Sequence, residues 1–106
     1  MKKLKSIKVG PVKYQLVESA SLLGENGQAY DGVHRPSEGK LMVRSGIPDG
    51  TYKKVVLMHE IIHACFETTG LDVPLEWRER ICDALGYQIV GLIKENPQLV
   101  EYVKSN

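Results

Sequence analysis

Apolar and polar side chains alternate along the first half of the chain. Residues 7–17 follow a roughly two-residue period, interrupted by one Gly-Pro pair, and shorter alternating runs occur at 28–34 and 40–44. This period is typical of β-strands, and the glycine- and proline-containing segments between the runs, such as residues 24–27, are typical of turns. The pattern therefore predicts a small antiparallel β-sheet of three or four strands.

The second half of the chain shows the longer apolar period of helices. Residues 51–69 predict a first helix that stops at Gly70, and residues 74–94 predict a second helix that ends before an Asn-Pro pair. Residues 98–104 predict a short C-terminal helix. The link between the two long helices is short, so they should pack antiparallel. We expect an α+β fold in a single domain that spans residues 1–106.

Composition narrows the class of protein. The 106 residues include 42% hydrophobic and 25% charged side chains, and the formal net charge is +1, as is ordinary for one soluble domain. No extended basic block or long apolar segment is present, so we expect neither nucleic-acid binding nor a membrane span. No apolar segment follows the basic N-terminus, which argues against a secretory signal. Two cysteines within predicted helices indicate reduced thiols and a cytoplasmic location.

The first long helix carries the sequence His59-Glu60-Ile61-Ile62-His63 in otherwise apolar surroundings. Residues four apart lie on one face of a helix, so the two imidazoles should point at a common spot and could bind one zinc ion. Glu60 is offset by about 100°, a position from which it can hold and deprotonate a water. Burying these three polar side chains costs several kcal/mol unless they are paired or bind a metal. Two hydrogen-bonded core histidines beside an unrelated glutamate are the plainer alternative.

The second long helix offers a third ligand. Glu79 shares a face with Cys82, Asp83 and Gly86, and an unpaired carboxylate on that apolar stripe would be costly, so we predict Glu79 as the ligand. Asp83 lies one turn further and could accept the second ring N–H of a ligand histidine, although a rim aspartate paired with an arginine is an alternative. Cys82 is a second possible ligand, or simply a core residue.

Three further acidic or basic side chains lie near these positions in the sequence pattern. Glu76 is another possible ligand, but an ion pair with Arg80 explains it more simply. Glu67 follows His63 by one turn, and we expect it either to form a salt bridge, for instance with Arg78, or to contact solvent. His34 could donate a hydrogen bond to an oxyanion in the cleft, and a satisfied structural histidine is the alternative.

At these residues the chain resembles the zincin metallopeptidases. "HEIIH" matches their signature, and "ERICD" (79–83) is similar to the Glu-x-x-x-Asp helix of the gluzincin branch. The resemblance implies that His59, His63 and Glu79 bind zinc, that Glu60 is the general base, and that Asp83 orients a histidine. Residues 27–104 also resemble small zincin-like proteins of bacteriophages and prophages, which implies a bacterial or phage-infected host cell.

The expected activity is hydrolysis of a peptide or protein substrate with one Zn²⁺ ion. Residues 40–44 are expected to form an edge strand beside the cleft, to which an extended peptide could add. The alternative is a metal-binding phage assembly or interaction module that keeps the fold without turnover, which the small size of the chain favours. The sequence leaves open the substrate, endo- versus exopeptidase action and the oligomeric state.

Overall fold

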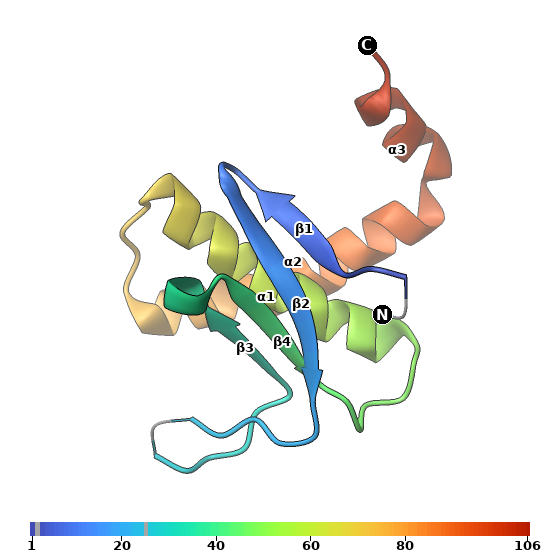
Figure 1. The fold of residues 1–106 in the computed structure, drawn as a ribbon. Coiled ribbons are helices and arrows are strands. Elements are labelled where there is room, and N and C mark those ends of the chain that lie inside the picture. Colours follow the sequence, from blue (N-terminus) through green and yellow to red (C-terminus); the bar gives the residue numbers. More distant parts are fainter. Residues whose placement is uncertain (2, 25) are drawn as a thin grey trace.

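The computed structural model describes residues 1, 3–24 and 26–106, and it confirms an α+β fold (Figure 1). The predicted turn at 24–27 includes Glu25, which lies outside the described residues. The elements in chain order are β1 (Ser6–Val9), β2 (Val12–Ser19), β3 (Gly32–Arg35), the 3₁₀ turn η1 (Pro36–Glu38), β4 (Lys40–Arg44), α1 (Thr51–Thr69), α2 (Leu75–Glu95) and α3 (Pro97–Lys104).

The four strands form a mixed sheet in the order β1-β2-β4-β3, not a wholly antiparallel one. β2 runs parallel to β4, with Leu16 opposite Leu41, while the β1–β2 and β3–β4 pairs are antiparallel. The reason is that the chain leaves β2, crosses to the far edge of the sheet to form β3, and returns as β4 between them. The alternation of apolar and polar residues indicates which face of the sheet each side chain occupies. It does not indicate that β4 lies between β2 and β3.

The strand expected at the sheet edge, residues 40–44, is therefore internal, and that prediction is wrong. Its apolar side chains Leu41 and Val43 are fully buried, and β2 and β3 flank it on its two sides. The edge strand next to α1 is β3, whose four residues are all only partly buried.

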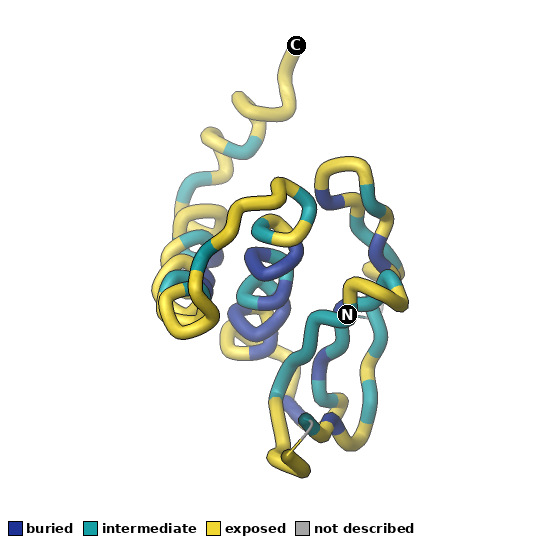
Figure 2. Tube along the Cα trace, turned by 90° about the vertical axis from the view of Figure 1, so that its left-hand side faces the viewer, coloured by how far each residue is buried: buried dark blue, intermediate teal, exposed yellow. Residues whose placement is uncertain are grey.

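The two long helices form two further layers over one face of the sheet. α1 lies between the sheet and α2, and Figure 2 shows that buried positions are concentrated on this middle helix while α2 is largely exposed. α1 and α2 run antiparallel, as predicted (Figure 1). Gly86 lies where the two helices touch: a Cβ atom there would be in ordinary van der Waals contact with α1, 3.5 Å from the Val55 carbonyl oxygen and 3.6 Å from the His59 nitrogen.

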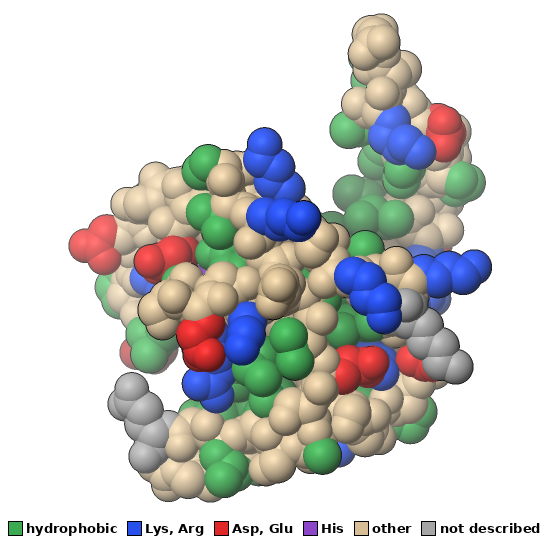
Figure 3. All heavy atoms as spheres, viewed as in Figure 1, with side chains coloured by type: hydrophobic (Ala, Val, Ile, Leu, Met, Phe, Trp, Pro, Cys, Tyr) green, Lys and Arg blue, Asp and Glu red, His purple; other side chains and the backbone are tan. Residues whose placement is uncertain are grey.

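The C-terminal helix α3 extends away from the rest of the molecule (Figure 1). It exposes Tyr102 and Val103, and Figure 3 shows hydrophobic side chains at the surface of this projecting segment. Within the described residues, no helix combines the length and apolar character that a bilayer crossing needs.

Candidate metal centre

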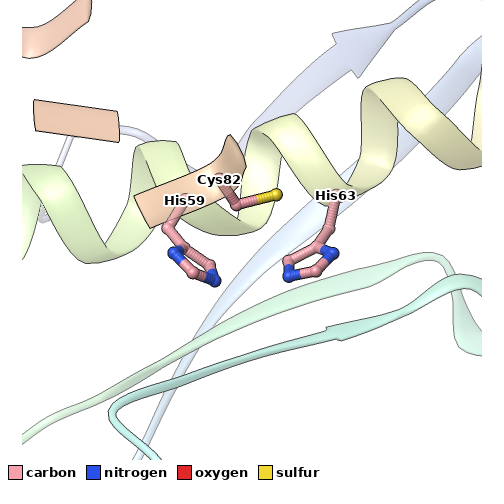
Figure 4. A group of neighbouring side chains, drawn as sticks. All are labelled: His59, His63 and Cys82. Carbon is pink, nitrogen blue, oxygen red and sulfur yellow. The ribbon is translucent and has the colours of Figure 1, made fainter. Parts of the chain in front are cut away.

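The two histidines of α1 occupy consecutive turns and present their rings to one side of the helix. The ring centroids of His59 and His63 are 4.9 Å apart. Figure 4 shows both rings directed to the same region, with the Cys82 side chain entering beside them from α2. The local geometry expected from a four-residue spacing in a helix is therefore present.

Glu79 of α2 reaches both imidazoles. Its Oε1 atom lies 2.6 Å from His63 Nε2, and its Oε2 atom lies 3.3 Å from His59 Nε2. On the far side of the His59 ring, Asp83 Oδ1 lies 2.9 Å from Nδ1. A hydrogen bond from Nδ1–H to this carboxylate leaves the Nε2 lone pair of a neutral His59 directed at Glu79. The structure thus brings together the four residues predicted for ligation and its support.

These donors fit a zinc ion. Two imidazole nitrogens and one carboxylate oxygen are the ligand set of many catalytic zinc sites, which keep the fourth position open. Bonds of about 2.0–2.1 Å in tetrahedral geometry separate ligand atoms by roughly 3.3 Å. Glu79 Oε2 already has this separation from His59 Nε2, whereas the 2.6 Å contact with His63 Nε2 is made by the other oxygen, Oε1, so the side chains must shift to share one ion. The Glu79 side chain is half exposed and has room for that adjustment.

Cys82 and Asp83 are alternative donors. The Cys82 sulfur lies within 4.8 Å of a nitrogen from each histidine, and one oxygen each from Glu79 and Asp83 forms a similar group with His59. Burial, reinforced by the charges of Glu79 and Glu60, raises the pKa of the Cys82 thiol to about 12. Without a metal ion this environment keeps Cys82 as the thiol, whereas a bound cation would favour the thiolate that coordinates it. Asp83 is already engaged by the opposite ring nitrogen.

Glu60 lies inside the molecule beside this group. Its side chain is almost fully buried, and its Oε2 atom is 3.9 Å from His59 Nε2. Burial, together with the negative charges of Glu79 and Asp83, raises the pKa of Glu60 to about 8. A bound divalent cation would oppose this shift, because a neighbouring positive charge favours the carboxylate form.

Gly32 of the edge strand makes room for the Glu60 carboxylate. A Cβ atom at Gly32 would lie 2.9 Å from Glu60 Oε2 and 2.9 Å from Val56 Cγ1. Gly32→Ala is therefore expected to lower the free energy of unfolding by about 1–3 kcal/mol, as overpacking does. Chemical denaturation should show this as a lower midpoint. Gly91→Ala is the matched control, since no atom lies within 4 Å of the added Cβ and alanine favours a helix, so its midpoint should rise. An unchanged midpoint for Gly32→Ala would contradict the tight packing.

His34 of β3 lies on the other side of His63. The two rings are stacked, with centroids 6.5 Å apart and planes at 14°. His34 Nε2 is 3.2 Å from the hydroxyl of Tyr14, which is 1% exposed. Burial, helped by the neighbouring His63, lowers the pKa of His34. The sequence analysis missed Tyr14, although a buried tyrosine usually needs a polar partner for its hydroxyl.

Neither of the two ion pairs considered for Glu67 and Glu76 forms among the described residues. Glu67 is exposed to solvent, the other outcome expected for it, and Arg78 donates from Nη2 to the Val73 carbonyl oxygen at 3.3 Å. Arg80 lies over the Trp77 ring, 5.2 Å from its centroid, and makes no bridge to the exposed Glu76.

One cleft of about 850 Å³ lies between β3, α1 and α2 and is lined by His34, His59, Glu60, His63, Glu67, Arg78, Glu79 and Asp83. Tyr30, Tyr52 and Tyr87 line it as well, and Asp31 in the same wall is held by Arg44 at 3.0 Å and by the Tyr52 hydroxyl at 2.5 Å.

Comparisons with protein-family models, with curated proteins and with solved structures find no match for this chain. Interpretation of the site therefore depends on its own geometry.

Proposed function

We propose that this protein is a zinc-dependent peptidase in which His59, His63 and Glu79 hold the metal. The observation that carries the proposal is the convergence of two imidazole nitrogens and one carboxylate beside a second, buried carboxylate, Glu60, that is not needed as a ligand. A purely structural metal site requires only ligands. Burying an acid next to three ligand atoms lowers the stability of the fold, and a catalytic role for that acid would explain why it is buried there.

Glu60 is placed to move protons during hydrolysis. Zinc at this site would supply a Lewis acid that polarises the scissile carbonyl and lowers the pKa of a coordinated water. Glu60 would accept a proton from the attacking water and deliver it to the nitrogen of the leaving amine, while the water oxygen bonds to the carbonyl carbon. Asp83 would keep His59 in the tautomer that directs Nε2 at the metal.

The edge strand β3 offers a place for an extended substrate. The Arg44 N–H donates to the Asp31 carbonyl at 2.8 Å, and the register then pairs Gly32 with Val43 and His34 with Leu41. Hydrogen-bonded and non-hydrogen-bonded pairs alternate in an antiparallel ladder, so the backbone groups of Gly32 and His34 face away from β4. A peptide could add to these groups next to Glu60 and His63.

His34 is the candidate donor to the oxyanion that forms at the carbonyl. If Tyr14 donates its O–H to Nε2 of a neutral His34, the ring proton is on Nδ1 and remains available for the substrate. The lowered pKa of His34 favours this neutral form at physiological pH.

Metal analysis and peptide digestion test the proposal together. Protein reconstituted with zinc and freed of excess metal should contain about one zinc ion per chain. Mass spectrometry of a mixed peptide library should show cleavage that a zinc chelator stops and added zinc restores. Protein that binds no zinc after reconstitution, or that cleaves equally well in the presence of chelator, would contradict it.

A non-catalytic interaction module, for instance in phage assembly, is the second candidate, and α3 is the feature that favours it. This helix projects from the domain with Tyr102 and Val103 exposed, as a surface that contacts a partner would be. Zinc binding without cleavage of any library peptide would support this candidate over the peptidase.

A further inference from the structure

Arg78 is a cationic side chain in the wall of the cleft that the zinc chemistry leaves unused. It immediately precedes Glu79 on α2, it is half-buried, and it lines the same cavity as His63 and Glu60. Arg78 is therefore near enough to influence a ligand that occupies the cleft.

The structure holds the Arg78 guanidinium in place without neutralising it. Nη2 donates to the Val73 carbonyl oxygen at 3.3 Å, and the central guanidinium carbon lies 5.6 Å from the centroid of the Phe66 ring. Within the described part of the chain, no carboxylate lies within 4.0 Å of this guanidinium, and its buried Nε has no hydrogen-bond partner. An arginine with an ordered plane and unused donors is prepared for a planar acceptor.

Other charged side chains around the cleft differ from Arg78, because they have partners or are exposed to solvent. Arg44 is paired with Asp31, and Glu79 and Asp83 contact the histidines. Glu67 also lines the cleft, and it is exposed to solvent, where a carboxylate is hydrated at little cost. Among the described residues that line the cleft, Arg78 is thus the lysine or arginine for which a ligand would supply a missing counterion.

We propose that Arg78 binds a carboxylate of the peptide substrate and so determines specificity; this rests on the proposed peptidase function. The planar guanidinium can donate two parallel N–H bonds to the two carboxylate oxygens, which a main-chain amide cannot match. The carboxylate can come from the C-terminus of the peptide or from an Asp or Glu side chain. The first source would make the protein favour sites near chain ends, and the second would make it favour acidic sequences.

Binding of three peptides to the zinc-loaded Glu60→Gln protein tests the proposal without turnover. All three peptides have an acetylated N-terminus. The first two share one sequence without acidic residues and have a free or an amidated C-terminus, respectively. The third is the amidated peptide with one residue replaced by Glu. Arg78→Gln should weaken binding of at least one carboxylate peptide about tenfold and leave the amidated peptide unchanged. The peptide that responds identifies the source of the carboxylate.

Arg80→Gln is the matched control, because it removes the same charge from the same helix at a side chain that stacks on Trp77 outside the cleft. It should leave all three affinities within about twofold, since an exposed charge contributes little. Equal weakening of all three peptides by Arg78→Gln, or no weakening of any, would overturn the proposal. The same titrations with metal-free protein distinguish failure of the carboxylate subsite from failure of the peptidase proposal. If binding of a carboxylate peptide depends on Arg78 although the protein neither binds zinc nor cleaves peptides, the subsite stands and the peptidase proposal fails.

The side-chain Nε–H resonance of Arg78 gives a second measurement that does not depend on a variant. In labelled protein without substitutions at 78 or 80, addition of the responding peptide should shift the Arg78 resonance and not that of Arg80. An unmoved Arg78 resonance at saturating peptide would overturn the contact even if the Arg78→Gln protein were poorly folded.

Discussion

Replacing Glu60 with glutamine is expected to lower kcat by about 10³-fold, within the range typical of a lost general base, while zinc remains bound. Glutamine has the shape of glutamate, and Glu60 is not among the three side chains assigned to the metal, so the fold and the ion should persist. The amide cannot accept a proton from water. Single-turnover cleavage of the best library peptide and metal analysis of the same sample measure both halves of the prediction.

Glu76→Gln is the matched control for this change. Glu76 is an exposed acid on α2 that the sequence also allowed as a ligand, and the structure places it outside the ligand groups. The variant should keep both zinc and activity within about twofold. Activity that survives in Glu60→Gln would exclude the proton-transfer role, whereas loss of zinc from Glu60→Gln would make Glu60 a ligand.

Loss of a metal ligand should have the second largest effect. His63→Ala is expected to raise the dissociation constant for zinc by on the order of 10³-fold, because a site with three protein ligands loses one bond and the carboxylate that faced it loses its partner. Glu79→Gln should act in the same direction with a smaller effect, since the amide oxygen can still coordinate. Competition with a zinc-binding dye measures both constants.

Cys82→Ala separates the two possible third ligands. The sulfur is close enough to both histidines to be a ligand, but the thiol is fully buried and its pKa is raised by that burial. If Glu79 is the ligand, Cys82→Ala should leave the zinc affinity within about threefold and lower only the stability, as a large-to-small change in a core does. A Cys82→Ala effect on zinc as large as that of His63→Ala would assign the site to the thiolate.

Most of the fold follows from local patterns in the sequence. The strand at Lys40–Arg44 has the predicted limits, and α1 and α2 begin and end within a few residues of the predictions. The pairing of the strands does not follow, because Leu41 and Val43 would alternate in the same way in an edge strand as in the central one. Insertion of β4 between β2 and β3 depends on how the chain connects these two strands, and the alternating pattern of residues 28–34 does not determine that connection.

The candidate site also has contacts that the sequence predicts and contacts that it does not. His59 and His63 are predictable together because helix geometry alone brings a four-residue spacing onto one face. The approach of Glu79 also requires α1 and α2 to pack closely, and Gly86 was the sequence signal for it. The hydrogen bond between Tyr14 and His34 joins β2 and β3, which are not neighbours in the sheet. Among the described residues Arg78 has no carboxylate partner, because Glu67 does not come within 4.0 Å of it. No local spacing encodes either contact.

The distribution of the site over the chain bears on how the protein assembles. The proposed metal ligands all belong to the α1–α2 hairpin, so they can meet by closing one short loop, for which the entropy cost is small. The pocket around Glu60 is completed only when Gly32, from an earlier strand, docks on α1. An ion captured by the helical hairpin would hold it together while the slower, non-local sheet forms, and the protein would gain its cation before it gains its acid–base chemistry.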